Sequence, residues 1–286
     1  MKPAPFEYRR ADSVEEALHH LGEFGEEAKL LAGGQSLVPL LSFRLAKPAC
    51  LVDVNPLTSL DYIERNGTLR IGALTRHRAL EDHLAARTFP LLAEAVPLIG
   101  HPAIRNRGTV GGSLAHADPA AELPVAAVAL AATLHAEGPD GKRAIPAAAF
   151  FTDYFETALA SGEILTEVSI PAPGDEWGWS FLEMSRRHGD FAVVCVAAGV
   201  APDPGGLCAD ARLVLGGVGP GPLRAAEAEE FLRGGPLDPK RLAEAGKIVA
   251  DAVRPPGDVH ASSEFRKHLS GVLSERALRA ARERAQ

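Results

Sequence analysis

Apolar residues recur at helical spacing close to the N-terminus of the chain. In residues 12–24, Ser13 followed by Glu16 forms a capping box, a pair whose side chains satisfy free backbone N–H groups at a helix start. Apolar residues then follow at intervals of three and four, a spacing typical of one buried helix face. We therefore expect a helix here.

The next segment predicts two strands with a helix between them. An apolar strand over residues 29–32 runs into the pair Gly33–Gly34, a helix begins near Ser36, and the run CLVDV (50–54) makes a second strand. Strand, helix and strand in this order favour a βαβ-like unit with parallel pairing.

Short strands and helices continue to alternate further along the chain. Residues 68–75 predict a third strand, followed by a helix over about 76–86 and another around 90–99. The stretch 123–138 begins as a buried helix and turns to strand around Thr133, and residues 162–171 predict a strand. No internal repeat of fixed period is present in this pattern.

A different pattern begins at residues 171–178, whose Pro, Gly and acidic content is typical of a linker. We place a domain boundary here, near residue 174. Three runs of β-branched and small apolar residues follow without helices between them, which favours a three-stranded antiparallel sheet. Helical patterns come after the strands, over 223–234, 238–253 and about 262 to the end. Strands followed by helices indicate an α+β fold class.

Composition and charge narrow the class of protein. The 286 residues are 46% hydrophobic and 23% charged, which is typical of a globular protein. A net charge of −7 argues against a broad phosphate-binding surface for nucleic acid. No apolar run reaches the length of about 18 residues that a membrane span requires, and the N-terminal residues do not resemble an export signal. We expect a cytoplasmic protein.

The three cysteines, Cys50, Cys195 and Cys208, are isolated thiols without CxxC spacing. An iron–sulfur cluster needs about four cysteine ligands, so this chain is not expected to hold one, and a buried apolar role is the default for each thiol. The 10 histidines form no HExxH pair, so the sequence predicts no zinc site.

The first candidate for chemistry is the loop AGGQSL, at a junction from strand to helix. Glycines allow the backbone to approach a ligand closely and to expose N–H groups, and a helix start favours an anion such as a pyrophosphate. Gln35 and Ser36 can add side-chain hydrogen bonds. The alternative is a tight turn with Ser36 as a helix N-cap. The loop matches neither GxGxxG nor GxxxxGK[ST], which disfavours a Rossmann domain. The residues in question are Ala32, Gly33, Gly34, Gln35, Ser36 and Leu37.

The second candidate is the stretch AIRNRGTVGGSLAHADPAAELP, residues 103–124, which repeats this chemistry. A glycine pair again lies beside hydroxyl donors, and Asp118 follows at a distance along the chain that allows contact with a ribose or ribityl hydroxyl. The alternative is a surface loop in which Asp118 caps the helix at Glu122. One extended diphosphate ligand explains two such loops better than two unrelated turns. The residues are Thr109, Gly111, Gly112, Ser113 and Asp118.

These motifs carry a resemblance to a known family. LAGGQSLVPLL and IRNRGTVGGSLAHADPAAELP, with EILTEVSIP and SRRHGDFAVV further on, resemble the flavoprotein (medium) subunit of the molybdenum hydroxylases, which include aerobic carbon monoxide dehydrogenase and xanthine dehydrogenase. The resemblance covers nearly the whole chain. It implies a vanillyl-alcohol-oxidase-type (PCMH-type) FAD-binding domain over 1–174, in lobes of about 1–56 and 57–174, and a smaller α+β domain over 175–286.

The resemblance also implies roles for the two loops. Their backbone holds the FAD pyrophosphate in the family, and Asp118 matches an aspartate that contacts the sugar-alcohol region of the cofactor. Leu165 matches a position near the flavin or adenine, and Phe191 an aromatic position near the isoalloxazine, with a core strand residue as its alternative. Many relatives carry Asn in place of Ser113. Some carry Lys in place of Glu183, where a carboxylate would disfavour an anionic reduced flavin.

The remaining polar residues of this region are expected to be structural. FAD carries the chemistry of electron transfer itself, so no dedicated general base is needed. His77 is therefore expected to play a structural role. His101 and His116 are assigned no catalytic role, and Arg105 and Arg107 are expected to be solvated rather than bound to the pyrophosphate.

By resemblance, the chain is an FAD-dependent oxidoreductase subunit without a molybdenum site or iron–sulfur cluster of its own. A molybdopterin-binding large subunit oxidises the substrate, a small subunit with two [2Fe-2S] clusters passes electrons to FAD, and an external acceptor receives them. A dimer of heterotrimers, reaching the inner face of the membrane only through the complex, is expected. The carbon monoxide dehydrogenase branch is favoured. The alternatives are a xanthine, aldehyde or N-heterocycle dehydrogenase, a stand-alone FAD reductase, and a non-catalytic nucleotide-binding protein.

Overall fold

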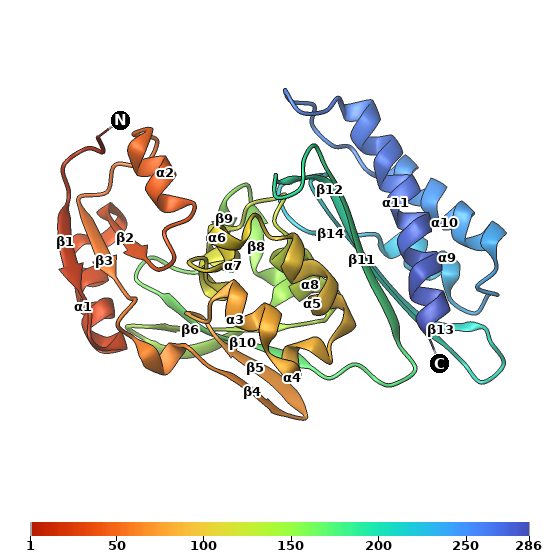
Figure 1. The fold of residues 1–286 in the computed structure, drawn as a ribbon, viewed down its shortest axis with the longest axis horizontal. Helices are drawn as coiled ribbons and strands as arrows, with labels where there is room; N and C mark the ends of the chain where they lie inside the picture. The colour runs from red at the N-terminus through yellow and green to blue at the C-terminus, as the bar shows by residue number, and fades with distance from the viewer. Residues whose placement is uncertain (1, 286) are drawn as a thin grey trace.

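A computed structural model describes residues 2–285 of the chain. At one end, three short parallel strands in the order β1–β3–β2 carry the helix α1 (Figure 1). The expected parallel pairing of the two strands around the first loop is confirmed. The elements are β1 (Glu7–Arg10), α1 (Val14–Phe24), β2 (Ala28–Leu31), α2 (Leu37–Ser42) and β3 (Cys50–Asp53).

The capping box at the start of α1 is present with one variation. Ser13 Oγ accepts a hydrogen bond from the backbone N–H of Glu16 at 3.1 Å. The Glu16 carboxylate accepts from the N–H of Asp12 at 2.8 Å, one residue before the N-cap. Both contacts satisfy backbone donors that lack partners at a helix start, so they stabilise the helix as the sequence predicts.

The middle of the chain forms a five-stranded antiparallel sheet in the order β4–β5–β10–β6–β7. A two-stranded hairpin, β8–β9, lies beside it. The strands are β4 (Ile63–Asn66), β5 (Thr68–Gly72), β6 (Thr133–Gly138), β7 (Gly141–Pro146), β8 (Phe151–Asp153), β9 (Glu156–Thr157) and β10 (Ile164–Pro171).

Helices cover one face of this sheet. The helix expected over 76–86 is interrupted, because His83 has an extended backbone with φ −77° and ψ 128°. The switch from buried helix to strand expected around Thr133 is confirmed. The helices are α3 (His77–Asp82), α4 (Leu84–Arg87), α5 (Pro90–Ala95), α6 (Pro102–Arg105), α7 (Val110–His116) and α8 (Glu122–Ala129).

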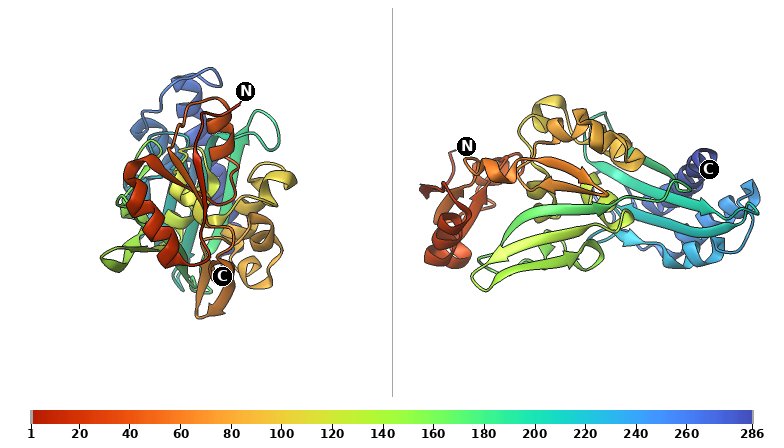
Figure 2. Two further views of the ribbon diagram at one scale, coloured as in Figure 1. Left: turned by 90° about the vertical axis from the view of Figure 1, so that its left-hand side faces the viewer. Right: turned by 90° about the horizontal axis from the view of Figure 1, so that it is seen from below.

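The C-terminal part is an antiparallel sheet with helices packed on one face (Figures 1 and 2). Three long strands were expected, and the sheet has a fourth, because two residues before the first helix pair with Val214 and Leu215. The elements are β11 (Gly178–Ser185), β12 (Ala192–Pro202), β13 (Cys208–Gly216), β14 (Leu223–Arg224), α9 (Ala226–Leu232), α10 (Pro239–Ala252) and α11 (Ser263–Arg284). Within residues 2–285, no helix has both the length and the apolar content to cross a membrane.

Three apolar cores hold these layers together. One lies under α1 and the three-stranded sheet, and another lies between the four-stranded sheet and α9–α11. The largest core joins the five-stranded sheet and its helices to the opposite face of the four-stranded sheet, through residues such as Phe181 and Ala197. The molecule is elongated, with the three sheets following one another along its length (Figure 2).

The C-terminal core generates a stability prediction. Leu213 on β13 is 0% exposed and Leu84 on α4 is 78% exposed. Truncating a fully buried leucine leaves a cavity, so Leu213→Ala should lower the free energy of unfolding by about 2–5 kcal/mol. The matched change Leu84→Ala should stay within about 0.5 kcal/mol. Urea denaturation of both variants measures the difference, and equal losses would contradict this packing.

Candidate functional site

The two glycine loops touch each other directly. Gly33 is buried, and a Cβ atom added to it would lie 2.4 Å from the carbonyl oxygen of Arg107 and 2.8 Å from Cα of Gly108. Because no side chain fits in that space, only glycine allows this approach. The structure therefore brings together the two segments that the sequence singled out separately.

The first loop exposes backbone donors. Gly34 has φ +72°, in the left-handed region that favours glycine. Gln35 Nε2 donates to the carbonyl of Gly33 at 3.0 Å, which fixes that side chain within the loop. Ser36 occupies the N-cap position of α2 but makes no side-chain capping bond, so its hydroxyl is available. Within the described residues, the N–H groups at positions 33–36 donate no backbone hydrogen bond.

The second loop uses its backbone donors inside the protein. The N–H of Val110 donates to Thr75 O at 2.9 Å, and that of Gly111 donates to Ala73 O at 2.8 Å. Thr109 Oγ1 accepts from Gly112 N at 3.1 Å, as the N-cap of α7. This loop therefore forms a fixed support for the first loop, and its half-buried Ser113 adds a hydroxyl group to the same helix turn.

Two residues that the sequence reasoning missed join the loops. Asn55 Nδ2 donates to the carbonyl of Ala32 at 2.9 Å. Arg76 donates from Nη2 to Asn55 Oδ1 at 2.7 Å and from Nη1 to the carbonyl of Arg107 at 2.5 Å. Asn55 could have been found from the sequence, because it is a polar residue that lies two positions after the parallel strand β3. Ligands often bind at the carboxyl ends of parallel strands.

His77 supports the second loop from below. It is 4% exposed, its N–H donates to Gly108 O at 3.0 Å, and its Nε2 donates to Thr109 O at 2.9 Å. A Cβ atom at Gly108 would lie 2.8 Å from Nδ1, so the ring also fills the space beside that glycine. Burial lowers the pKa of His77 to about 4, which keeps the ring neutral. These contacts agree with the expected structural role.

The two arginines of the second motif differ. Arg105 is 6% exposed, its Nε lies 2.8 Å from a Glu81 carboxylate oxygen, and its Nη1 donates to the carbonyl of Gly100 at 2.9 Å. The expectation of a solvated role is therefore wrong for Arg105, because a long-range ion pair makes burial favourable. Arg107 is exposed, as expected. His101 is also exposed, and His116 lies with its ring centroid 5.2 Å from that of Phe155.

The three remaining predicted contacts lie outside the paired loops. Asp118 is half-buried, and its Oδ1 accepts from Ala120 N at 2.9 Å in the turn before α8. Leu165 is 5% exposed on β10, next to Thr166, whose carbonyl accepts from the N–H of Ala73 beneath the second loop. Phe191 is 63% exposed between β11 and β12, so its alternative as a core strand residue is wrong.

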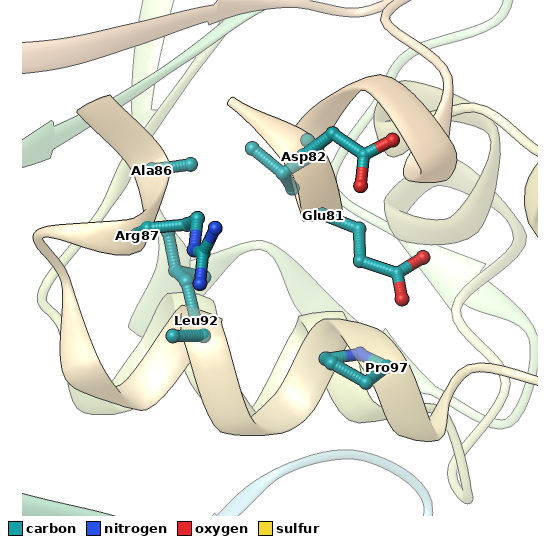
Figure 3. Close-up of a pocket in the computed structure, with 8 residues that line it drawn as sticks. Glu81, Asp82, Ala86, Arg87, Leu92 and Pro97 are labelled. Carbon is teal, nitrogen blue, oxygen red and sulfur yellow. The ribbon is translucent and has the colours of Figure 1, made fainter. Parts of the chain in front are cut away.

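A separate cavity of about 300 Å³ lies between α3, α4 and α5. Glu81 and Asp82 lie on one side of it, with Arg87, Leu92 and Pro97 on the others (Figure 3). Glu81 already pairs with the buried Arg105. None of the glycine-loop residues lines this cavity, so it does not belong to the candidate site.

Comparisons with known proteins identify the family. Residues 4–173 match the FAD binding domain in molybdopterin dehydrogenase, and residues 179–281 match the CO dehydrogenase flavoprotein C-terminal domain. The chain belongs to the family of FAD-binding subunits of molybdopterin dehydrogenases. Within it, the chain is an FAD-carrying oxidoreductase subunit of the medium-chain type. The family resemblance expected from the two glycine motifs is confirmed.

Several relatives share the full length of the chain. The 6-hydroxypseudooxynicotine dehydrogenase complex subunit alpha of Paenarthrobacter nicotinovorans is 43% identical, over 100% of this chain and 97% of the relative. The carbon monoxide dehydrogenase medium chain of Hydrogenophaga pseudoflava is 35% identical, over 98% of both chains. A solved structure of carbon monoxide dehydrogenase from the latter organism, which lacks the Mo-pyranopterin moiety of the cofactor, superposes with a TM-score of 0.97, at 36% identity and full coverage of both chains.

The donors of the first loop suit a pyrophosphate group. Free backbone N–H groups and a hydroxyl are the groups that bind phosphate oxygens without a cationic side chain. Because α2 has only six residues, the loop amides themselves supply most of this attraction. The absence of side chains at Gly33–Gly34 leaves the backbone of this loop accessible to close approach.

The contact between the loops predicts that adding a methyl group at Gly33 destabilises the protein and weakens FAD binding. In Gly33→Ala, the new Cβ would press on the carbonyl of Arg107, so the loops must separate. We expect a loss of about 1–3 kcal/mol in unfolding free energy and loss of bound FAD, measured by urea denaturation and flavin absorbance. Gly22→Ala is the matched control, because nothing lies within 4 Å of its added Cβ on α1. Normal FAD content in the Gly33 variant would contradict the loop contact.

The buried His77 predicts a pH dependence of stability. Its pKa is about 4 in the folded protein, against an ordinary value of 6.5, so between these values only the unfolded chain binds the proton. The free energy of unfolding therefore falls as the pH drops from about 6.5 to about 4, by about 3 kcal/mol in all. The unfolding free energy of His77→Gln, measured by denaturation, should not show this fall with pH. The control variant His83→Gln, which changes an exposed histidine, should show it. Identical pH profiles for wild type and His77→Gln would refute this assignment.

Proposed function

We propose that the first loop binds the FAD pyrophosphate and that the second loop holds it in position. The observation that best supports this proposal is the direct contact of the loops at Gly33, together with the N–H groups at positions 33–36, which donate no backbone hydrogen bond within the described residues. The proposed contacts are Ala32, Gly33, Gly34, Gln35, Ser36 and Leu37 from the first loop and Thr109, Gly111, Gly112 and Ser113 from the second. Bound FAD would accept and deliver electrons.

Three further residues complete the proposed site. Asp118 has one carboxylate oxygen that makes no bond in the turn before α8 and is free for a sugar-alcohol hydroxyl. Phe191, which is 63% exposed, offers an aromatic face at the end of the β11–β12 hairpin. Leu165 would act through packing, because it lies in the core on β10, the strand whose Thr166 carbonyl accepts from the N–H of Ala73.

We propose a division of the chain near residue 174. The FAD-binding domain would comprise 1–174, in lobes of about 1–56 and 57–174, and the C-terminal domain 175–286. The positions of the sheets support this division: the three-stranded sheet lies within residues 7–53, the five-stranded sheet within 63–171, and the four-stranded sheet starts at Gly178.

We further propose that the chain passes electrons within a complex and does not select the substrate. The relatives are subunits of multi-subunit dehydrogenases, and those of 35–43% identity are named for carbon monoxide, caffeine and 6-hydroxypseudooxynicotine. One chain type thus accompanies chemically different substrates, which supports substrate selection on another subunit. We propose a carbon monoxide dehydrogenase-like assembly with a molybdopterin subunit and a [2Fe-2S] subunit in a dimer of heterotrimers, and an external electron acceptor.

The isolated chain tests this function. We expect one FAD per chain, complete bleaching of the flavin absorbance by dithionite, and its return when a quinone is added. Oxidation of the organic substrate should appear only when the partner subunits are added. A colourless chain that does not take up FAD would overturn the cofactor assignment. Steady turnover of a nicotinamide by the chain alone would support a stand-alone reductase instead.

A further inference from the structure

A row of three residues crosses the four-stranded sheet on its face toward α8. Glu183 on β11 lies opposite Cys195 on β12, which lies opposite Gly216 on β13. Residues directly opposite each other in an antiparallel sheet project from the same face. Cys195 is fully buried in the core that this face shares with α8, so Glu183 points toward the same side.

The start of α8 lies on this row. A Cβ atom at Gly216 would lie 2.7 Å from both Cys195 Sγ and Val125 Cγ2, and the N–H of Gly217 donates to Pro119 O at 2.7 Å. Glu122 precedes Val125 by three positions and therefore shares its helix face. Both Glu122 and Glu183 act on the Cys195 thiol, whose pKa is raised first by burial and then by these two carboxyl groups.

Neither carboxyl group has a cationic partner or a side-chain hydrogen bond among the described residues. Glu122 is 5% exposed, and the one hydrogen bond that acts on its carboxylate comes from its own backbone N–H. Oε2 of Glu183 is buried and has no hydrogen-bond partner within the described chain. An ionised carboxylate in such surroundings is costly, and binding a proton removes that cost.

Among the described residues, the elements packed against α8 bring no unpaired cation to the pair, and the buried Arg266 of α11, which packs against β11, is paired with Asp258 at 2.6 Å. The charged groups that act on Glu122 are Glu183 and Asp118, both acidic. On the elements packed against α8, cations are already paired: Arg224 of β14 with Glu229 at 2.7 Å, and Arg212 of β13 with Asp210 at 3.8 Å. On α5, Glu94 pairs with Arg284 of α11 at 2.6 Å. On α7, burial lowers the pKa of His116 and disfavours its charged form.

We propose that Glu122 and Glu183 form a carboxyl pair that holds one proton at neutral pH and binds a second when the neighbouring cofactor site gains negative charge. The proton comes from solvent through Glu183, the half-buried member, and converts a carboxylate into a carboxylic acid without any transfer of electrons. The link to the cofactor rests on the proposed function. Asp118, the proposed sugar-alcohol contact, already acts on Glu122.

The direction of the pKa shifts agrees with this geometry. Burial raises the pKa of Glu122 to about 8; the hydrogen bond from its own backbone N–H opposes this shift, and repulsion from Glu183 and Asp118 adds to it. Burial raises the pKa of Glu183 to about 7. Around neutral pH the pair therefore carries about one proton, and added negative charge nearby raises both values further.

Infrared spectroscopy of the FAD-free full-length chain tests proton binding without using the cofactor. At pH 7 we expect a carbonyl band of a protonated carboxylic acid that disappears at higher pH. The band should weaken in Glu122→Gln and in Glu183→Gln, be lost in the double variant Glu122→Gln/Glu183→Gln, and be kept in Glu26→Gln, an exposed carboxyl on the distant N-terminal lobe. Absence of the band from the wild-type protein at pH 7 would overturn the proposal, even if a variant failed to fold.

The flavin midpoint potential, measured against pH on the FAD-loaded chain, tests the coupling. A tenfold change in a two-electron equilibrium corresponds to about 30 mV, so each proton taken up adds about 30 mV per pH unit to the slope. Between pH 6 and 8 the wild type and Glu26→Gln should show a steeper slope than Glu122→Gln/Glu183→Gln. Equal slopes in proteins that contain FAD would refute the coupling. A failure to bind FAD, recognised by the missing flavin absorbance, would instead refute the proposed function.

Discussion

The contact between the Gly33 backbone and the carbonyl of Arg107 is the constraint on which the rest of the site depends. It requires that no side chain occupy the space between the two loops, since a single Cβ atom would come within 2.4 Å of that oxygen. The first loop connects β2 to α2 and the second connects α6 to α7, so the two are far apart in sequence. Because the loops touch, Asn55 and Arg76 can connect them with hydrogen bonds. The absence of a side chain at Gly33 therefore allows these polar groups to meet.

The two loops look alike in sequence and differ in what their backbones do. The N–H groups of the second loop are used by Thr75, Ala73 and Thr109, whereas those at positions 33–36 remain free. A buried N–H group without a partner is costly, so a loop with several free donors is stable only where solvent or a ligand reaches it. The second loop is fixed by its own hydrogen bonds, and a rigid support of this kind reduces the ordering that a ligand of the first loop would have to impose.

Sequence patterns among neighbouring residues predicted much of the fold, but contacts between residues far apart in sequence could not be predicted. The capping box at Ser13, the strands around the first loop and the glycine pairs depend on residues close in sequence, and the structure contains all of them. The ion pair of Arg105 with Glu81 depends on helix packing that no local pattern specifies, so burial of Arg105 could not be predicted. The same applies to the link between Asn55 and Arg76. The individual roles of the loop residues toward FAD remain predictions.

The shared core joins the C-terminal part to the part of the chain that contains both glycine loops. Phe181, Cys195 and Val214 pack in the same cluster as α8, so the four-stranded sheet forms one wall of the FAD-binding part rather than a separate appendage. The row of Glu183, Cys195 and Gly216 on that wall faces α8, the helix that follows the second loop. The four-stranded sheet and the helices around the second loop therefore share one packing surface, and a substitution on the inner face of β11 or β12 changes the surroundings of α8 without touching any residue of the glycine loops.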